Sequence, residues 1–254
     1  MDAQTPGTEE LNLPQAFLLL ATNDKHGTLE VPVFALRTTL AGAILAELDM
    51  IGAIHLEGKH VRATGTTPGT DFQHELDLIR HKSRPHTPKA WVSMLEGRAE
   101  VQRVYEGMVS RGIVEHVGEK HLGVFQTVRY PEKDHAPEAA LVQKLEAALS
   151  DTSAPPQVPE SAEAVSASQD AGAPDAAAAA GVPDAAAAKP AAKAHEPRIL
   201  ALIALLEAAG LLSRLFPAAD RVWADELAKD YWPARAVEDE LRMIRLAEEE
   251  AANL

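Results

Sequence analysis

Three arginines are the residues whose type and placement favour a particular chemistry. Arg37 lies on the helix expected in the middle of the fold, and Arg98 and Arg103 lie at the start of a later helix. A guanidinium group presents several N–H donors in one plane, which suits bidentate contacts with phosphate oxygens. Arg37, Arg98 and Arg103 are therefore candidate ligands for an anionic headgroup, with ordinary surface charge as the competing and commoner reading of such spacing.

Histidines and carboxylates also recur, but none of them forms a complete ligand set on spacing alone. His74 and His81 share a helical face, whereas His55 with His60 and His116 with His121 could face each other across the two hairpins. A metal site with only two ligands and no third nearby is a poor one. Asp71, Glu75 and Asp77 are best read as a helix cap and a solvated face. The sequence predicts no metal ligands and no cofactor.

Catalytic signatures and composition narrow the function further. The sequence contains no dinucleotide-binding glycine motif, phosphate-binding loop, nucleophile elbow or zinc-protease motif, so we predict that the protein is not an enzyme. The formal net charge of −14 argues against non-specific binding to nucleic acid, which needs a basic surface. The absence of cysteine fits a reducing compartment, so a cytoplasmic location is expected.

The elements that must position these side chains are organised around residues 40–56, LAGAILAELDMIGAIHL. Apolar residues at helical spacing predict a buried helix over about 34–51. Within it, Gly42 would let a neighbouring backbone approach closely, and Gly52 would end the helix in a left-handed conformation. Residues 54–56 and 60–62 then predict a hairpin with its turn at 57–59.

Further helices are expected on both sides of this stretch, near 14–20, 72–79, 88–95, 99–111, 137–149, 198–216, 220–229 and 233–250. Asp71 is predicted to cap the second of these and Thr87 the third. A second hairpin is expected from 113–117 and 122–128, turning at 118–120. The last helix should face the core with Val237, Leu241, Ile244 and Leu246. The fold class is mainly α, a helical bundle with one or two short β-hairpins.

Residues 151–196 differ in kind from the rest. They are mostly alanine, proline, serine and acidic residues, and GAPDAAAA at 172–179 recurs as GVPDAAAA at 181–188. Such a segment buries too little to offset its chain entropy, so we expect a disordered insertion. The helix after it is too apolar to stand in solvent. Residues 11–150 and 197–254 are therefore predicted to form two parts of one domain, behind a disordered leader at 1–10. The most apolar run of the chain, residues 199–212, is about 14 residues long, which is shorter than the roughly 20 residues that span a bilayer.

In several segments along its length, the sequence resembles the Golgi phosphoprotein 3 family. The matching pieces occur in family order and are FLLLATNDKHG (17–27), LAGAILAELDMIGAIHLEGKHV (40–61), TTPGTDFQHELDLI (66–79), WVSML (91–95), VYEGMVSRGIVEH (104–116), VFQTVRYP (124–131) and LALIALLEAAGLLSRLFP (200–217). The composition, short loops and linker favour a bacterial, actinobacterial member. The resemblance implies a helical bundle ringed by amphipathic helices, with a projecting hairpin.

The resemblance also implies a function. Eukaryotic members are peripheral membrane proteins that bind phosphatidylinositol 4-phosphate and hold glycosyltransferases in the Golgi through their cytosolic tails. For this chain it implies a non-enzymatic peripheral adaptor at the inner face of the cell membrane. Its expected partners are an anionic phospholipid surface and the cytosolic tails of membrane proteins, with homo-oligomerisation left open.

The family's lipid pocket aligns with Pro32, Ala41, Arg98 and Val101, of which only Arg98 keeps the family's residue type. Arg37, one turn from Ala41, and Arg103, two residues past Val101, could partly replace the missing charge. The family's membrane-touching hairpin corresponds to residues 113–128, with Val124 and Phe125 as its expected apolar contacts. The alternative is a soluble protein-interaction module that has lost phosphoinositide binding.

Overall fold

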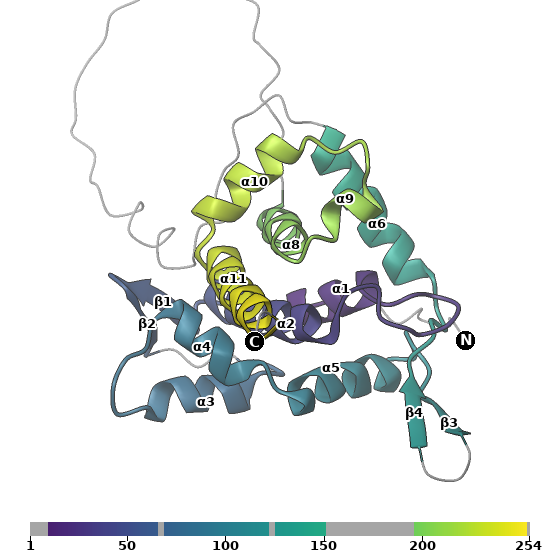
Figure 1. Cartoon of the computed structure of the whole chain (residues 1–254), viewed down its shortest axis with the longest axis horizontal. Coiled ribbons are helices and arrows are strands. Elements are labelled where there is room, and N and C mark those ends of the chain that lie inside the picture. Colours follow the sequence, from purple (N-terminus) through teal and green to yellow (C-terminus); the bar gives the residue numbers. More distant parts are fainter. Residues whose placement is uncertain (1–9, 66–68, 122–124, 151–195, 253–254) are drawn as a thin grey trace, which may run out of the picture.

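The structure is a computed structural model, and it describes residues 10–65, 69–121, 125–150 and 196–252. These residues form mostly α-helices, together with two separate antiparallel two-stranded hairpins. Figure 1 shows α1, α2 and α8 near the centre, with α3, α4 and α5 on one side and α6, α9 and α10 on the other. The predicted fold class, mainly α with short hairpins, is confirmed.

The helix α2 (Val33–Met50) is the centre of the bundle, and most of its side chains are buried. It packs against α1 (Leu13–Leu20), α4 (Pro88–Leu95), α8 (Pro197–Ala208) and α11 (Trp232–Ala252). A Cβ at Gly42 would overlap a methyl group of Val237 in α11 and would lie 3.4 Å from the backbone carbonyl of Pro233, so the close approach predicted there is present. Gly52 has a φ of 70° and follows the end of α2, as predicted.

One buried carboxylate connects the three central helices. Glu47 of α2 accepts a hydrogen bond of 2.8 Å from the first backbone N–H of α1, at Leu13, and forms an ion pair with Arg198 in the first turn of α8. The apolar helix α8 packs against α1 and α2, although residues 151–195 separate it from them in the sequence. The predicted leader and insertion lie almost wholly outside the described residues, so the division into two parts of one domain stays a prediction.

The first hairpin and the helices that follow it agree with the predictions from sequence in all but one detail. Strands β1 (Ile54–Glu57) and β2 (His60–Ala63) pair as predicted, and they are followed by α3 (Gln73–His81), α4 and α5 (Arg98–Ser110). Thr87 caps α4 through a 3.3 Å hydrogen bond from the N–H of Ala90. Asp71 does not cap α3, because its carboxylate instead accepts a hydrogen bond from the side chain of Asn12.

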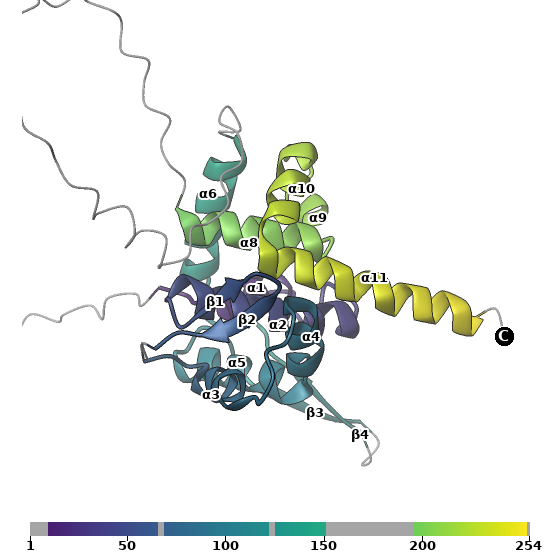
Figure 2. The same ribbon diagram turned by 90° about the vertical axis from the view of Figure 1, so that its left-hand side faces the viewer.

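The second hairpin lies further along the chain than the sequence predicted. Its strands are β3 (Val117–His121) and β4 (Phe125–Arg129), so Gly118 is paired with Val128 rather than placed in the turn. The physical reason is that Ile113 and Val114 are buried in the core and cannot leave it to form a strand of the hairpin. Figures 1 and 2 show the resulting hairpin projecting from the body of the molecule.

The C-terminal elements are α6 (Ala136–Ser150), α8, α9 (Leu212–Leu215), α10 (Arg221–Asp230) and α11. The predicted continuous helix over 198–216 is wrong, because Gly210 has a φ of 72° and separates α8 from α9. Leu246 was expected to be buried but is 47% exposed, since the second half of α11 extends beyond the bundle (Figure 2). Among the described helices, none has the length and hydropathy needed to cross a membrane.

Candidate functional site

A pocket of about 450 Å³ opens between the start of α2, one face of α5 and the base of the β3–β4 hairpin. Two predicted arginines, Arg37 of α2 and Arg98 of α5, line it, and Arg129 of β4 adds a third guanidinium group. Its other lining residues are Gly27, Thr28, Leu29, Val33, Leu36, Val101, Gln102, Tyr105, Val128 and Tyr130. We call this the arginine pocket. None of its described lining residues is Asp, Glu, His or Cys, so it carries positive charge and offers no metal ligand.

The geometry of α5 decides which of its arginines reaches this pocket. Arg98, Val101, Gln102 and Tyr105 recur at helical spacing and share the pocket face. Arg103 follows Arg98 by five residues, which turns it about 140° around the helix axis. It points away from the pocket and forms ion pairs with Glu75 at 2.5 Å and Glu100 at 3.6 Å. The three predicted arginines therefore do not converge on one site.

The charges of Arg37 and Arg98 are not neutralised by the described part of the protein. Arg98 is exposed and Arg37 is partly buried. Within the described ranges, neither side chain makes an ion pair or a hydrogen bond. Two guanidinium groups from different helices thus remain available to an anion, and the low polarity of the pocket walls strengthens such an attraction.

Two stacked tyrosines form a rigid wall of the arginine pocket. The rings of Tyr105 and Tyr130 are 4.0 Å apart between centroids and 3° from parallel. The hydroxyls of Tyr105 and Thr22 share a buried hydrogen bond of 2.7 Å, and burial raises the pKa of Tyr105 to about 12. Burial and the carboxylate of Glu106 also raise the pKa of Tyr130. Both phenols are therefore neutral near pH 7.

Gly27 allows this wall to close. It has a φ of 60°, and a side chain there would overlap the backbone of Tyr130 and Pro131. Its carbonyl accepts a hydrogen bond of 3.4 Å from the N–H of Tyr130. Only glycine combines this backbone conformation with so close an approach.

Apolar side chains surround the pocket on its exposed side. Val33 at the start of α2 is 49% exposed, Val128 of β4 is 38% exposed, and Leu29 is similarly exposed. The predicted contact residue Val124 lies outside the described residues. Phe125 begins β4, but only its backbone is described. The assignment of Val124 and Phe125 to membrane contact stays a prediction.

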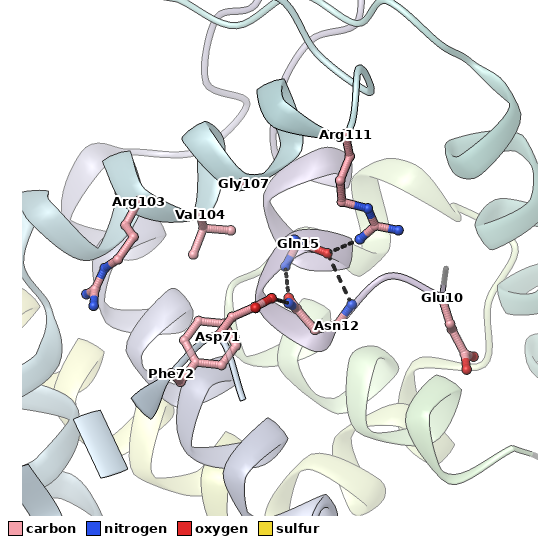
Figure 3. A pocket seen from close by; sticks show the side chains of 9 residues that line it. All are labelled: Glu10, Asn12, Gln15, Asp71, Phe72, Arg103, Val104, Gly107 and Arg111. Carbon is pink, nitrogen blue, oxygen red and sulfur yellow. Dashed lines mark hydrogen bonds between the residues drawn. The ribbon is translucent and has the colours of Figure 1, made fainter. Parts of the chain in front are cut away.

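Arg103 lies instead in a larger polar groove of about 710 Å³ between α5 and the start of α1. In Figure 3, Arg103 lies on one side of Gln15 and Asn12, and Arg111 lies on the other. Arg111 donates a 2.6 Å hydrogen bond to Gln15, whose backbone N–H bonds to Asn12. The polar groups of the groove are largely bonded to one another, which is the pattern of a structural network.

The positions aligned with the family's lipid pocket are distributed unevenly. Val101 lines the arginine pocket beside Arg98, whereas Pro32 is the exposed N-cap of α2. Ala41 is fully buried within α2 and does not line the pocket. Arg37, one turn before Ala41, lines it instead.

The histidine pairs considered from sequence do not face one another across the hairpins. His55 lies opposite Arg62, and His60 lies opposite Glu57. His121 lies opposite Phe125, while His116 contacts the ring of Tyr130. His74 and His81 share the wall of a shallow exposed pocket, without a converging third ligand among the described residues. One group of four potential ligands does converge elsewhere, at Asp24, Glu132, His135 and Glu138.

Comparison with known proteins assigns the chain to a family. The model of the Golgi phosphoprotein 3 (GPP34) family matches residues 13–244. This match spans every described helix apart from the end of α11. No curated protein matches the chain significantly. A match over most of its length shows that the chain belongs to the Golgi phosphoprotein 3 family.

Proposed function

We propose that this protein is a non-enzymatic adaptor that attaches to membranes by holding a phospholipid phosphate group in the arginine pocket. The observation that carries the proposal is the pair Arg37 and Arg98. Both line one pocket without a carboxylate, and neither has an ion-pair partner in the described residues. Family membership supports the adaptor role, and the bacterial origin of the chain stays a prediction.

The chemistry of the pocket suits a phosphorylated headgroup. Two guanidinium groups can each donate paired hydrogen bonds to phosphate oxygens, and Arg129 adds positive charge. A volume of about 450 Å³ lies within the usual range for small-ligand sites.

The expected attachment is weak and sensitive to salt. An anionic membrane surface contributes about 1 kcal/mol for each nearby basic residue. Three arginines would supply only about 3 kcal/mol, against an overall charge of −14 that opposes approach. The exposed side chains of Val33 and Val128 would add apolar contact at the bilayer surface. Because these apolar side chains lie beside the projecting hairpin, we expect the protein to bind with this hairpin facing the membrane.

Liposome co-sedimentation at low salt tests the proposal. Vesicles of phosphatidylcholine alone, with phosphatidylserine, or with phosphatidylinositol 4-phosphate separate general charge from headgroup recognition. We expect the phosphoinositide vesicles to bind most protein, and Arg98→Ala to reduce that binding at least roughly fivefold, the effect of about 1 kcal/mol. Arg62→Ala is the matched control, because Arg62 is exposed and pairs with Glu57 on the first hairpin.

Equal recovery of wild type and Arg98→Ala would overturn the proposal. Failure of the wild type to bind any vesicle would favour the alternative, a soluble protein-interaction module. In that case a pull-down from membrane-free cytosol should recover a protein partner of defined stoichiometry.

A further inference from the structure

Four potential metal ligands meet where three separate segments join, apart from the arginine pocket. Asp24 comes from the turn after α1, Glu132 follows β4, and His135 and Glu138 lie at the start of α6. Each offers one ligand atom, and these atoms all lie within 4.8 Å of one another. The spacing of the sequence did not predict this group, because Asp24 is distant from the other three in the chain.

The backbone around the cluster is hydrogen-bonded into a frame. The N–H of Glu132 donates to the carbonyl of Asp24 at 2.9 Å, which fixes two of the segments together. Val114 pairs with Glu132 in an isolated β-bridge, and both Lys133 and Asp134 donate to the carbonyl of Ile113. The ligands are therefore carried by a connected framework rather than by independent loops.

Glu132 provides a second and separate indication of a ligand. Its side chain is only 8% exposed, and its Oε2 lies 2.8 Å from His135 Nδ1. Its other oxygen, Oε1, is buried and has no hydrogen-bond partner in the described residues. Glu138 Oε2 is buried and unpartnered in the same way. A buried carboxylate oxygen without a donor costs free energy unless a proton or a cation satisfies it.

The charges at the cluster do not balance. Three carboxylates face a single imidazole, and no lysine or arginine of the described residues forms an ion pair with any of the four. Burial, followed by the carboxylates of Asp24 and Glu132, raises the pKa of Glu138 to about 8. Burial first, and nearby negative charge second, disfavour the ionised form of this carboxyl group.

We propose that Asp24, Glu132, His135 and Glu138 bind one divalent first-row transition-metal ion, for which Zn²⁺ and Mn²⁺ are the natural probes. An imidazole nitrogen with carboxylate oxygens suits these ions, whereas Mg²⁺ and Ca²⁺ prefer sites made only of oxygen. Ligand bonds of about 2.1 Å place tetrahedral ligands roughly 3.4 Å apart. Small side-chain rotations would bring atoms that already lie within 4.8 Å to that separation.

Such an ion would connect α6 and the turn after α1 to the base of the projecting hairpin. Gly27 and Tyr130, which line the arginine pocket, lie three and two residues from the ligands Asp24 and Glu132. Metal binding would therefore hold the wall of that pocket in place. The metal site does not depend on the proposed lipid function, because its ligands lie outside the pocket.

Isothermal titration calorimetry on the full chain, after treatment with EDTA, tests the proposal. We expect Zn²⁺ to bind at one strong site, Mn²⁺ more weakly, and Ca²⁺ weakest. His135→Gln and Glu138→Gln should each weaken the site at least tenfold, since losing even an outer-shell group costs about 10–100-fold in metal affinity. His135 is exposed and Glu138 is only partly buried, and glutamine keeps the size of the Glu138 side chain, so these variants should fold, and circular dichroism checks this.

The chain has ten histidines, and any exposed histidine can bind Zn²⁺ weakly. His81→Gln is therefore the matched control for loss of a single exposed histidine. His81 is exposed, and among the described residues it does not belong to a group of three or more potential metal ligands. It should leave the strong site unchanged. Equal affinity in wild type and His135→Gln, or the absence of saturable binding, would overturn the proposal. The carboxylates of Glu132 and Glu138 would then share a proton instead. Binding of Ca²⁺ as tight as that of Zn²⁺ would overturn the assigned metal class.

Discussion

Arg98 and Arg103 lie five residues apart on the same helix, but their surroundings are opposite. Arg98 lines a pocket that has no carboxylate and finds no ion-pair partner in the described residues. Arg103 pairs with Glu75, whose side chain is fully buried, and with Glu100. Neutralisation by the fold, rather than the presence of arginine, therefore separates a candidate binding group from a structural one.

The same contrast holds for the two cavities as wholes. In the arginine pocket, Arg37 and Arg98 have no ion-pair partner among the described residues, and exposed apolar side chains lie around them. The larger groove of Figure 3 contains two arginines as well, but Arg111 bonds to Gln15 and Arg103 to Glu75. Between these two cavities the groove is the larger, whereas the unpaired charges of Arg37 and Arg98 favour the smaller pocket.

The largest expected effect concerns stability. Arg103→Ala should lower the free energy of unfolding by about 3–5 kcal/mol, because it leaves the buried carboxylate of Glu75 without its partner. Arg98→Ala should change it by no more than about 0.5 kcal/mol, as for an ordinary surface substitution. Urea denaturation of both variants measures the difference. Adding Glu75→Gln to Arg103→Ala should restore part of the loss. Equal losses for the two arginines would show that Arg103 is no more neutralised by the fold than Arg98.

The second effect concerns lipid binding. Removing both pocket arginines, Arg37→Ala with Arg98→Ala, should cost about 2 kcal/mol of membrane affinity, or roughly 30-fold. Arg111→Ala, in the groove, should leave binding unchanged and serves as the matched control. Repeating the liposome titration near 1 M salt should shrink the difference, because the Debye length falls to about 3 Å. Equal sensitivity to the Arg111 change would erase the distinction between pocket and groove.

The smallest effect concerns the tyrosine wall. Tyr105→Phe should cost about 1 kcal/mol of stability through the lost hydrogen bond to Thr22. The cost stays modest because the Thr22 hydroxyl still donates to the carbonyl of Leu18 at 2.6 Å. Lipid binding should be unchanged, since the stacked ring remains.

The wall also has a pH dependence that thermal unfolding can follow. The pKa of Tyr105 is raised from 10.0 to about 12 in the folded protein. The stability that wild type holds over Tyr105→Phe should therefore be full below pH 10 and decline as the pH rises through 12. A difference that is constant with pH would show that the phenol is not buried as the fold implies.

Much of the fold could be predicted because its signals are local. The apolar periodicity of residues 40–51 predicted α2, and Gly52 predicted its end. Thr87 predicted the start of α4 through its own side chain. In each case the deciding interaction lies within a few residues of the signal. These predictions needed no knowledge of what packs against the helix.

The errors came where distant contacts decide. The turn signal at 118–120 was overridden, since Ile113 and Val114 are held in the core and shift the register of the hairpin. Asp71 was read as a helix cap but bonds to Asn12, which lies 59 residues away. Arg129 was not selected as a pocket residue, because the predicted strand ended at Val128 and its orientation was unknown.

The amino-acid sequence was enough to predict the family, the mainly helical class and the type of residue that could bind a phosphate group. These depend on composition, periodicity and motif order, which the chain carries in every conformation. The folded structure was needed to show that Arg37 and Arg98 share a pocket while Arg103 is neutralised by Glu75, 28 residues away. It also brought Asp24 to Glu132, His135 and Glu138. Electrostatic interactions depend on distance in space, and spacing along the chain does not contain that distance.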